Sequence, residues 1–305
     1  MTYDLAIIGG GPAGVAAGVY ASRKRLKTLF LTKDWGGQSS VSTEVQNWVG
    51  TVAVGGPALA EMLKKHLEAY AGEIVEIKTE AVEKVEKAGD SFSIKTETGR
   101  YEARTVLIAA GSHRRKLAVP GADRLEHKGI TYCASCDGPV FADLPVAVVG
   151  GGNAGFETAA QLLAYCKSVT LVHRSNDFRA DPVTVKKVLA HPKMRAVKNA
   201  EILEVKGEKS VTALVYKDEK GEQKELAVQG VFVEIGSLPS TEFVKGLVAL
   251  DQYGQVVTDP KNQRTSVAGV WAAGDVTNGL YHQNNIAAGD AVKALEDIYI
   301  YLHTK

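Results

Sequence analysis

Cysteine is scarce in this chain, with three residues in 305. A secreted domain held together by disulfides needs a much higher cysteine content, so that class of protein is excluded. An excess of charge of one sign is also lacking, because 36 basic residues balance 35 acidic ones and leave a net charge of +1. Neither a nucleic-acid-binding patch nor an acidic tail is therefore indicated.

Long hydrophobic runs are lacking as well. The first apolar run begins at Leu5 and is interrupted at Gly9–Pro12, so it is too short and too rich in glycine to cross a bilayer. The N-terminus, Met1-Thr2-Tyr3-Asp4, is acidic rather than basic. We therefore expect no secretory leader, no membrane partner and a cytoplasmic location.

What is present is an ordinary globular composition with abundant glycine. Hydrophobic residues make up 45% of the chain and charged residues 23%. A length of 305 residues exceeds one small core and predicts two domains of roughly 100–200 residues each. Clusters among the 31 glycines lie at the ends of expected strands.

The first part of the chain has the pattern of a βαβ unit. We predict a buried strand at Thr2–Gly9, a helix rich in small residues at Ala13–Ser22, and a second strand at Thr28–Leu31. The elements expected next are an amphipathic helix from Gly56-Pro57, a hairpin of Ser91–Thr96 and Arg100–Thr105, and another buried strand at Val106–Ala110 before Gly111.

The same order of elements begins again near residue 146. This second set comprises a strand at Val146–Val149, a helix through Leu163, a strand at Ser168–Val172, a hairpin of Val211–Tyr216 and Glu225–Val228, and a strand at Val231–Ile235. A third block, Val270–Asp275 with a helix from about Ala287 to Leu302, has no βαβ unit of its own and is expected to complete the first domain.

The segment Gly9-Gly10-Gly11-Pro12-Ala13-Gly14 fits the pattern G-x-G-x-x-G between the first strand and its helix. Glycines in this pattern allow a tight turn, close approach of a pyrophosphate and close packing of helix on strand. The helix N-terminus adds free N–H groups for the phosphates. A dinucleotide site is therefore predicted. Asp34 is the nearest acidic residue for its ribose, and a solvated turn is an equal alternative for that residue.

The segment Gly150-Gly151-Gly152-Asn153-Ala154-Gly155 repeats the pattern, so we expect two dinucleotides, a bound flavin and a mobile nicotinamide nucleotide. The next strand leads into His173–Arg179. A carboxylate at this place favours the free ribose of NAD, whereas a basic residue favours the 2′-phosphate of NADP. Arg174 and Arg179 therefore favour NADPH, with NADH left open and a solvated basic loop as the alternative for Arg179.

The segment Cys133-Ala134-Ser135-Cys136-Asp137 places two thiols at a spacing that can close a small disulfide loop. A zinc site needs about four ligands, and neither the third cysteine, Cys166, nor the seven histidines show a completing spacing. Redox chemistry is therefore favoured over zinc or an inert pair, and no metal site is predicted. Asp137 is a candidate proton shuttle, with a turn residue as the alternative, and Cys166 is expected to be a buried helix residue.

With these motifs the chain resembles the low-molecular-weight thioredoxin reductases, and it is similar to the reductase core of the alkyl hydroperoxide reductase flavoprotein. The resemblance runs from Tyr3 to about Leu302. The motifs that carry it are Ile7-Ile8-Gly9-Gly10-Gly11-Pro12-Ala13-Gly14, Gly36-Gly37-Gln38, Thr43-Glu44-Val45-Gln46-Asn47-Trp48, Thr131-Tyr132-Cys133-Ala134-Ser135-Cys136-Asp137-Gly138-Pro139, Gly150-Gly151-Gly152-Asn153-Ala154-Gly155 and Ala272-Ala273-Gly274-Asp275-Val276.

The predicted fold class is α/β, with two Rossmann-like domains of the glutathione reductase type that bind dinucleotides, the second inserted in the first. Residues 1–115 and 242–305 are expected to form the FAD-binding domain. Residues 116–241 are expected to form the NAD(P)H-binding domain with the cysteine pair. The resemblance also implies a homodimer and a rotation between the domains, with hinges near Lys116 and Leu238.

The resemblance implies a role for each candidate residue. Cys136 would lie beside the flavin, Cys133 would attack a thioredoxin-like protein substrate, and Asp137 would be the acid/base. The residues expected to bind FAD or NAD(P)H are Gly9, Gly11, Pro12, Ala13, Gly14, Gly37, Gln38, Asn47, Gly111, Gly152, Asn153, Ala154, Gly155, His173, Arg174, Arg179, Gly274, Asp275, His282 and Gln283.

The chain departs from the family pattern at several places. A second arginine is replaced in His173-Arg174-Ser175, which removes one contact to a 2′-phosphate. The usual threonine is replaced in Ala109-Ala110-Gly111, and His282 stands where a basic residue usually precedes Gln283. The chain also starts directly at the first strand, without a thioredoxin-fold extension, so a separate small dithiol protein is the expected acceptor.

Besides an NADH-preferring reductase of a peroxiredoxin system, three alternatives stay open at this point. One is a flavin electron-transfer protein or oxidase with an incidental cysteine pair, against which the Cys-x-x-Cys counts. Another is a disulfide reductase fed by ferredoxin. The third is a nucleotide sensor without catalysis, which would need no redox dithiol and would be colourless when purified.

Overall fold

The computed structural model describes residues 2–42 and 44–304, so Thr43 of the third motif lies outside the described residues. The chain divides into two compact units. One unit joins the chain up to His113 to the chain from Leu238 onward, and the other consists of Arg114–Ser237. Two Rossmann-like units of α/β type, one inserted in the other, are the fold class that the sequence predicts.

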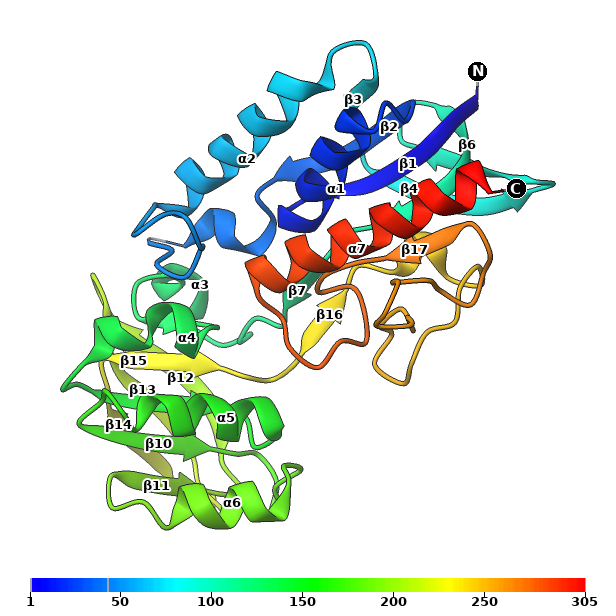
Figure 1. Cartoon of the computed structure of the whole chain (residues 1–305). Helices are drawn as coiled ribbons and strands as arrows, with labels where there is room; N and C mark the ends of the chain where they lie inside the picture. The colour runs from blue at the N-terminus through cyan, green and yellow to red at the C-terminus, as the bar shows by residue number, and fades with distance from the viewer. Residues whose placement is uncertain (1, 43, 305) are drawn as a thin grey trace. The chain divides into compact units, whose positions relative to one another are not determined.

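The first unit is built on a twisted, mostly parallel sheet (Figure 1). Its path is β3-β2-β1-β6-β5-β4, and β17 also pairs with β6. The strands are β1 (Thr2–Gly10), β2 (Thr28–Trp35), β3 (Val75–Thr79), β4 (Val82–Ala88), β5 (Ser91–Thr96), β6 (Arg100–Ile108) and β17 (Val270–Ala272).

Strand β6 corrects one expectation from the sequence. The second strand of the hairpin and the following buried strand are one continuous element, Arg100–Ile108. Its first half pairs antiparallel with β5, and its second half pairs parallel with β17. Strand β1 pairs along the opposite edge, which makes β6 central in the sheet. The sequence pattern also fails to predict β3 and β4, whose exposed positions are largely Lys and Glu.

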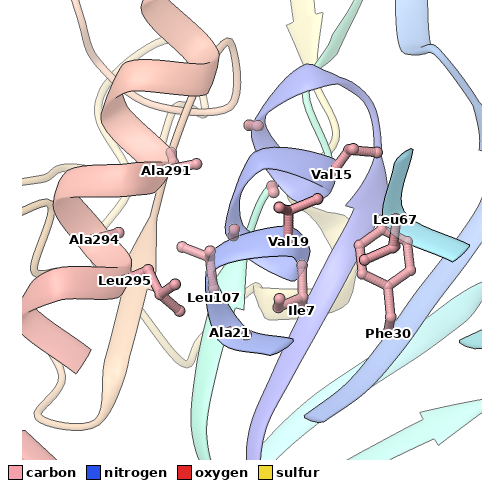
Figure 2. Packing of buried hydrophobic residues seen from close by; sticks show 14 of the residues in the cluster. Ile7, Val15, Val19, Ala21, Phe30, Leu67, Leu107, Ala291, Ala294 and Leu295 are labelled. Carbon is pink, nitrogen blue, oxygen red and sulfur yellow. The ribbon is translucent and has the colours of Figure 1, made fainter. Parts of the chain in front are cut away.

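Helices cover one face of this sheet. They are α1 (Pro12–Arg23), α2 (Gly56–Ala71) and α7 (Asn284–His303). Leu5 and Ile7 of β1 face the helices, whereas Ala6 and Ile8 belong to the hydrophobic cluster on the other face, as the two-residue period of a strand requires. Figure 2 shows α7 beside α1, and Ala291, Ala294 and Leu295 of α7 belong to the same hydrophobic cluster as Val19 of α1.

The second unit repeats this plan on a smaller scale. A parallel sheet of order β11-β10-β9-β15-β8 is accompanied by an antiparallel sheet of order β12-β13-β14. Its elements are β8 (Ile130–Thr131), β9 (Pro145–Val149), α5 (Asn153–Leu162), β10 (Ser168–Val172), α6 (Pro182–Leu189), β11 (Met194–Val197), β12 (Glu201–Gly207), β13 (Val211–Lys217), β14 (Gln223–Ala227) and β15 (Gly230–Val233).

Short elements connect these parts. The segments that link the units pair as β7 (Ser112–Arg114) and β16 (Ser237–Pro239). The remaining turns of helix are η1 (Gly37–Val41), α3 (Ala122–Leu125), α4 (Ala134–Asp137), η2 (Gly138–Phe141) and η3 (Glu242–Val244). Among the described residues, no helix has the length and apolar character needed to cross a bilayer.

Candidate functional site

Each unit carries a glycine-rich turn that joins a central strand to a helix. The turn joins β1 to α1 in the first unit (Figure 1) and β9 to α5 in the second. Gly9 and Gly150 open the two turns with φ angles of 125° and 131°. Such angles are strained for any residue with a Cβ atom. The duplication visible in the sequence is therefore also a duplication of backbone conformation.

The last glycine of each turn is fixed by packing. A Cβ atom on Gly14 would lie 1.8 Å from the carbonyl oxygen of Gly9, and a Cβ on Gly155 would lie 2.1 Å from that of Gly150. Both distances are far below van der Waals contact. Each helix can therefore pack this closely on its own strand only because these positions are glycine.

The third glycine of each turn is open instead. A Cβ on Gly11 would have its nearest neighbour, the Cα of Gly37, at 3.9 Å, and a Cβ on Gly152 would have no neighbour within 4 Å. Gly11 and Gly152 are also the N-caps of α1 and α5, where the described side chains provide no capping hydrogen bond. Open backbone beside an uncapped helix N-terminus suits an anionic phosphate.

The turn of the first unit borders a cleft of about 310 Å³, a volume within the range of small-molecule sites. The ends of β1 and β2, the segment that follows β6 and the start of α7 contribute to its lining. Asp34, at the end of β2, also lines it. The candidate residues in the lining are Gly9, Gly11, Pro12, Ala13, Gly37, Gln38, Gly111, Gly274 and Asp275.

Polar contacts in this cleft join segments that are far apart in the sequence. The Nε2 atom of Gln38 donates to the Oδ2 of Asp275 and lies at the same distance, 3.2 Å, from the Oγ of Ser112. Ser39 and Asn284 are hydrogen-bonded at 2.8–3.1 Å. These contacts hold the η1 segment against the start of α7.

Asn47, His282 and Gln283 lie outside the lining of this cleft. The Nδ2 of Asn47 donates to the Oε1 of Gln283 over 3.1 Å. The Nδ2 of Asn285 donates to the carbonyl oxygen of Asn47 over 2.7 Å. A ring nitrogen of His282 is hydrogen-bonded to the carbonyl oxygen of Gly279 at 2.9 Å. The segment around Asn47 is thus tied to the N-terminus of α7.

The residues of the cleft fit the flavin dinucleotide that the resemblance implies. Gly11 leaves open space next to the uncapped start of α1, as a pyrophosphate requires. The carboxylate of Asp275 and the amide of Gln38 provide an acceptor and donors for hydroxyl and ring atoms. The N-terminus of α7 provides a further partial positive charge.

In the second unit, His173 is buried and its ring packs on the glycine turn. A Cβ atom on Gly151 would lie 2.6 Å from that ring. The Nε2 of His173 is hydrogen-bonded to the carbonyl oxygen of Asp177 at 3.0 Å. Asn153 accepts a hydrogen bond from the backbone N–H of Asp181 at 2.8 Å. Both candidate residues therefore hold the loop in place, whereas Ala154 is exposed.

Arg174 and Arg179 are exposed in that loop. The backbone N–H of Arg179 donates to the carbonyl oxygen of Gly151 over 2.8 Å, which fixes the end of the loop beside the glycine turn. Counting the residues that the structure describes, no carboxylate pairs with either guanidinium. Both positive charges are available to a ligand.

Cys133 and Cys136 form a disulfide, with their Cα atoms 5.3 Å apart. Both residues are half-buried. Cys133 is the N-cap of α4, and its Sγ accepts a hydrogen bond from the backbone N–H of Cys136 at 3.2 Å. An N–H directed at sulfur from a helix start stabilises a thiolate. The backbone N–H of Cys136 would therefore stabilise the thiolate of Cys133 in the reduced pair.

Asp137 follows this pair and is half-buried. Its carboxylate accepts a hydrogen bond from the hydroxyl of Thr131 on β8, and its backbone N–H donates to the carbonyl oxygen of Cys133 over 3.0 Å. Burial raises the pKa of Asp137 above its ordinary value, although the Thr131 hydrogen bond and His127 oppose the shift. Such a group retains a proton more readily than an exposed aspartate does.

Cys166 is buried and free, and burial raises the pKa of its thiol to about 11. It is therefore a poor nucleophile in the folded protein. Over residues 2–42 and 44–304 there is no cluster of three or more His, Cys, Asp or Glu side chains suited to a metal ion.

Several residues near these sites are absent from the sequence-based set. Ser112 contacts Gln38, Thr131 contacts Asp137, and Glu80–Val82 line the cleft. Thr131 lies within a motif already singled out, so its position six residues before Asp137 is a usable signal. Glu80 and Ala81 lie between two strands that the sequence does not predict, and Val82 begins the second of these strands. None of the three belongs to a local motif.

Comparison with known proteins identifies the family. A model of the pyridine nucleotide-disulphide oxidoreductases matches residues 3–291. A solved structure of thioredoxin reductase from Streptococcus pyogenes has a TM-score of 0.91 and 35% identity, covering all of this chain and 99% of that one. The chain belongs to the pyridine nucleotide-disulphide oxidoreductase family and, within it, to the low-molecular-weight thioredoxin reductase group.

Some relatives are longer proteins. The chain is 36% identical to an NADH dehydrogenase of Bacillus subtilis, covering 98% of this chain and 58% of that protein. It is 38% identical to an alkyl hydroperoxide reductase component of Pseudomonas aeruginosa, covering 96% of this chain and 57% of that protein. The chain thus spans less than two thirds of these relatives.

Proposed function

We propose that the chain is an FAD-dependent oxidoreductase that uses NADPH to reduce a disulfide in a thioredoxin-like protein. The observation that carries this proposal is the Cys133–Cys136 disulfide at the start of α4, in a chain with two glycine turns built for dinucleotides. A nucleotide sensor or a simple electron carrier would need no such pair.

Bound FAD and NADPH would supply hydride transfer and an electron pair for the disulfide, which is chemistry that no side chain provides. Gly11, Gln38 and Asp275 of the first unit would hold FAD. Gly152 at the start of α5, together with Arg174 and Arg179, would hold NADPH. Reduction of the disulfide consumes two electrons and two protons in all and produces two thiols.

Cys133 is the thiol that attacks the partner protein. The backbone N–H of Cys136 points at its Sγ, so the Cys133 thiolate is the more stabilised of the two. Its attack on the partner disulfide forms a mixed disulfide and releases one partner thiolate. Cys136 then attacks Cys133, which restores the Cys133–Cys136 bond and releases the second partner thiolate. Asp137 supplies and recovers the proton that this exchange requires.

An NADH-preferring reductase of a peroxide-removing system is the second candidate function. Ser175 removes one positive charge from the segment that would bind a 2′-phosphate. An NADH dehydrogenase and a component of an alkyl hydroperoxide reductase are about as identical in sequence to this chain as the thioredoxin reductase of known structure is. A ferredoxin-linked flavin disulfide reductase is the further alternative. The proposal also includes a homodimer and a cytoplasmic location, which rest on the family resemblance.

The first test is to mix the purified holoenzyme anaerobically with NADPH and, separately, with NADH while following the flavin absorbance. Rapid bleaching by NADPH and slow bleaching by NADH support the proposal. The reverse preference supports the peroxide-linked alternative. Bleaching by neither nucleotide contradicts the nicotinamide site and makes ferredoxin the donor to test.

The cysteine pair is tested with Cys133→Ser and Cys136→Ser. Each variant should lose reduction of a protein disulfide, because one thiol cannot complete the exchange. Bleaching of the flavin by NADPH should persist, since neither cysteine lies in the glycine turns. Turnover of a protein disulfide by both variants would contradict the mechanism.

A further inference from the structure

Lys198 lies beside the loop that would bind the 2′-phosphate, although it is far from that loop in sequence. It directly follows β11, the strand next to β10. The backbone N–H of His173 donates to the carbonyl oxygen of Val197 over 2.8 Å, and that of Ala200 donates to the carbonyl oxygen of His173 over 3.0 Å. These two hydrogen bonds flank Lys198 and hold it alongside the start of the loop.

The side chain of Lys198 is held in place by a contact with Phe178. Its Nζ lies 4.7 Å from the centre of the Phe178 ring, within the range of a cation–π interaction. Phe178 is itself packed between Phe156 and His173, with ring centres 4.9 and 5.5 Å away. The ammonium group is therefore directed at the loop that carries both arginines.

The loop and Lys198 together carry more positive than negative charge. Arg174, Arg179 and Lys198 are three cations, and Asp177 is the one carboxylate of segment 173–179. Asp177 accepts a hydrogen bond from Asn176 at 3.1 Å. Within the described part of the chain, no acidic side chain forms an ion pair with any of the three cations. A phosphate monoester carries about two negative charges near neutral pH, which is what these cations can balance.

We propose that Lys198 is a specificity-determining residue for the 2′-phosphate of NADPH. It supplies the positive charge that is missing at Ser175, where the family pattern has a second arginine. The backbone N–H of Asn199 donates to the carbonyl oxygen of Ser175 over 3.4 Å, so Lys198 directly precedes a residue that touches the substituted position. The inference rests on the proposed function, because it assumes that a nicotinamide nucleotide binds at α5. It adds the residue that follows the neighbouring strand β11 to the basic loop.

The test measures equilibrium binding of two probes, 2′,5′-ADP and 5′-AMP, to the holoenzyme by titration calorimetry. Lys198→Gln should weaken binding of 2′,5′-ADP about threefold to fivefold, as expected for a charge-assisted contact at an exposed site. It should leave binding of 5′-AMP unchanged, and Lys198→Arg should keep most of the preference. Lys209→Gln, in the exposed turn after β12, removes the same charge elsewhere in the unit and serves as the control.

The outcomes separate this inference from the proposed function. If the wild type prefers 2′,5′-ADP and Lys198→Gln behaves like Lys209→Gln, the role of Lys198 is wrong while the nucleotide site stands. A wild type that binds both probes equally well also overturns the role of Lys198, because no 2′-phosphate is then recognised. If neither probe binds, the nucleotide site and the proposed function fail together.

Discussion

Asp137 is a carboxyl whose surroundings favour the protonated form. Burial raises its pKa, so the proton is retained to a higher pH than on an exposed aspartate. We expect Asp137→Asn to reduce disulfide turnover by about 100-fold or more, because the amide cannot donate a proton as the acid does. In the wild type, the proton-donating step should slow as the pH rises through the pKa of Asp137.

The measurement is the pH profile of disulfide reduction in the wild type and the variant. The variant should lose the titration attributed to Asp137 and keep its melting temperature, since Thr131 can still donate to the side-chain oxygen. An Asp137→Asn enzyme with wild-type turnover would show that the proton comes from another group.

Glu234 is a second buried carboxyl, with its side chain 5% exposed. It accepts a hydrogen bond from Thr158 at 2.8 Å and lies 3.5 Å from Arg114. Burial nevertheless raises its pKa, so the ionised form is less stable in the folded protein than in the unfolded chain. This penalty is absent below the pKa of the unfolded chain and grows as the pH rises through the folded pKa.

Glu234→Gln should therefore match the wild type at acid pH and melt about 2 °C higher at neutral pH, if removing the penalty is worth about 1 kcal/mol. Thermal unfolding across this pH range checks the expectation. Glu201→Gln, an exposed glutamate on β12, is the control and should show no such divergence. A variant less stable than the wild type at neutral pH would mean that attraction by Arg114 outweighs burial.

At the residue scale, the sequence predicts those candidates whose chemistry is contained in a short segment. The glycine turns and the Cys133–Cys136 pair have this property, and the structure places each at the start of a helix. Contacts such as that between Gln38 and Asp275 join residues 237 positions apart. No local pattern predicts them, because they depend on the order of strands in the sheet.

At the scale of elements, the glycine turns separate packing from ligand binding. Gly14→Ala places a Cβ on the Gly9 carbonyl oxygen and should force α1 away from β1, with a loss of at least about 2 kcal/mol of stability. Gly11→Ala has open space and an extended backbone, so it should change stability by less than about 0.5 kcal/mol. Chemical denaturation of the two apoproteins makes the comparison. Equal destabilisation by both changes would contradict the assigned difference.

Strands β3, β4 and β6 show why some elements cannot be predicted from the sequence pattern. Val75–Thr79 and Val82–Ala88 have few apolar residues, since each offers only part of one face to the core. In β6, the alternation of the first half gives way to a continuous apolar run in the second, because only the second half is buried on both faces. In the sequence, a change of hydrophobic pattern within one strand resembles a boundary between two strands.

For the whole molecule, the prediction of two Rossmann-like units, one inserted in the other, is confirmed. It succeeds because the order of elements occurs twice and the last block lacks a βαβ unit. The proposed binding roles of the two units should be separable. Gly11→Val should give a protein that loses FAD but still binds 2′,5′-ADP, whereas Gly152→Val should keep the flavin and lose affinity for that probe.

Flavin absorbance and calorimetric titration test this separation. Both positions have an extended backbone, which a β-branched residue accepts. Loss of both ligands in either variant would mean that the units do not bind independently.

The late position of β17 and α7 in the sequence has a consequence for synthesis on the ribosome. Residues 114–237 are contiguous, so the inserted unit has all its strands as soon as they emerge. The first unit cannot complete its fold until Val270–Ala272 and the final helix are synthesised. Until then, one edge of β6 is unpaired and the apolar side of α1 is uncovered. A nascent chain that stalls before these segments would have a folded second unit and an incompletely folded first unit. The first unit is therefore the part that a chaperone would bind.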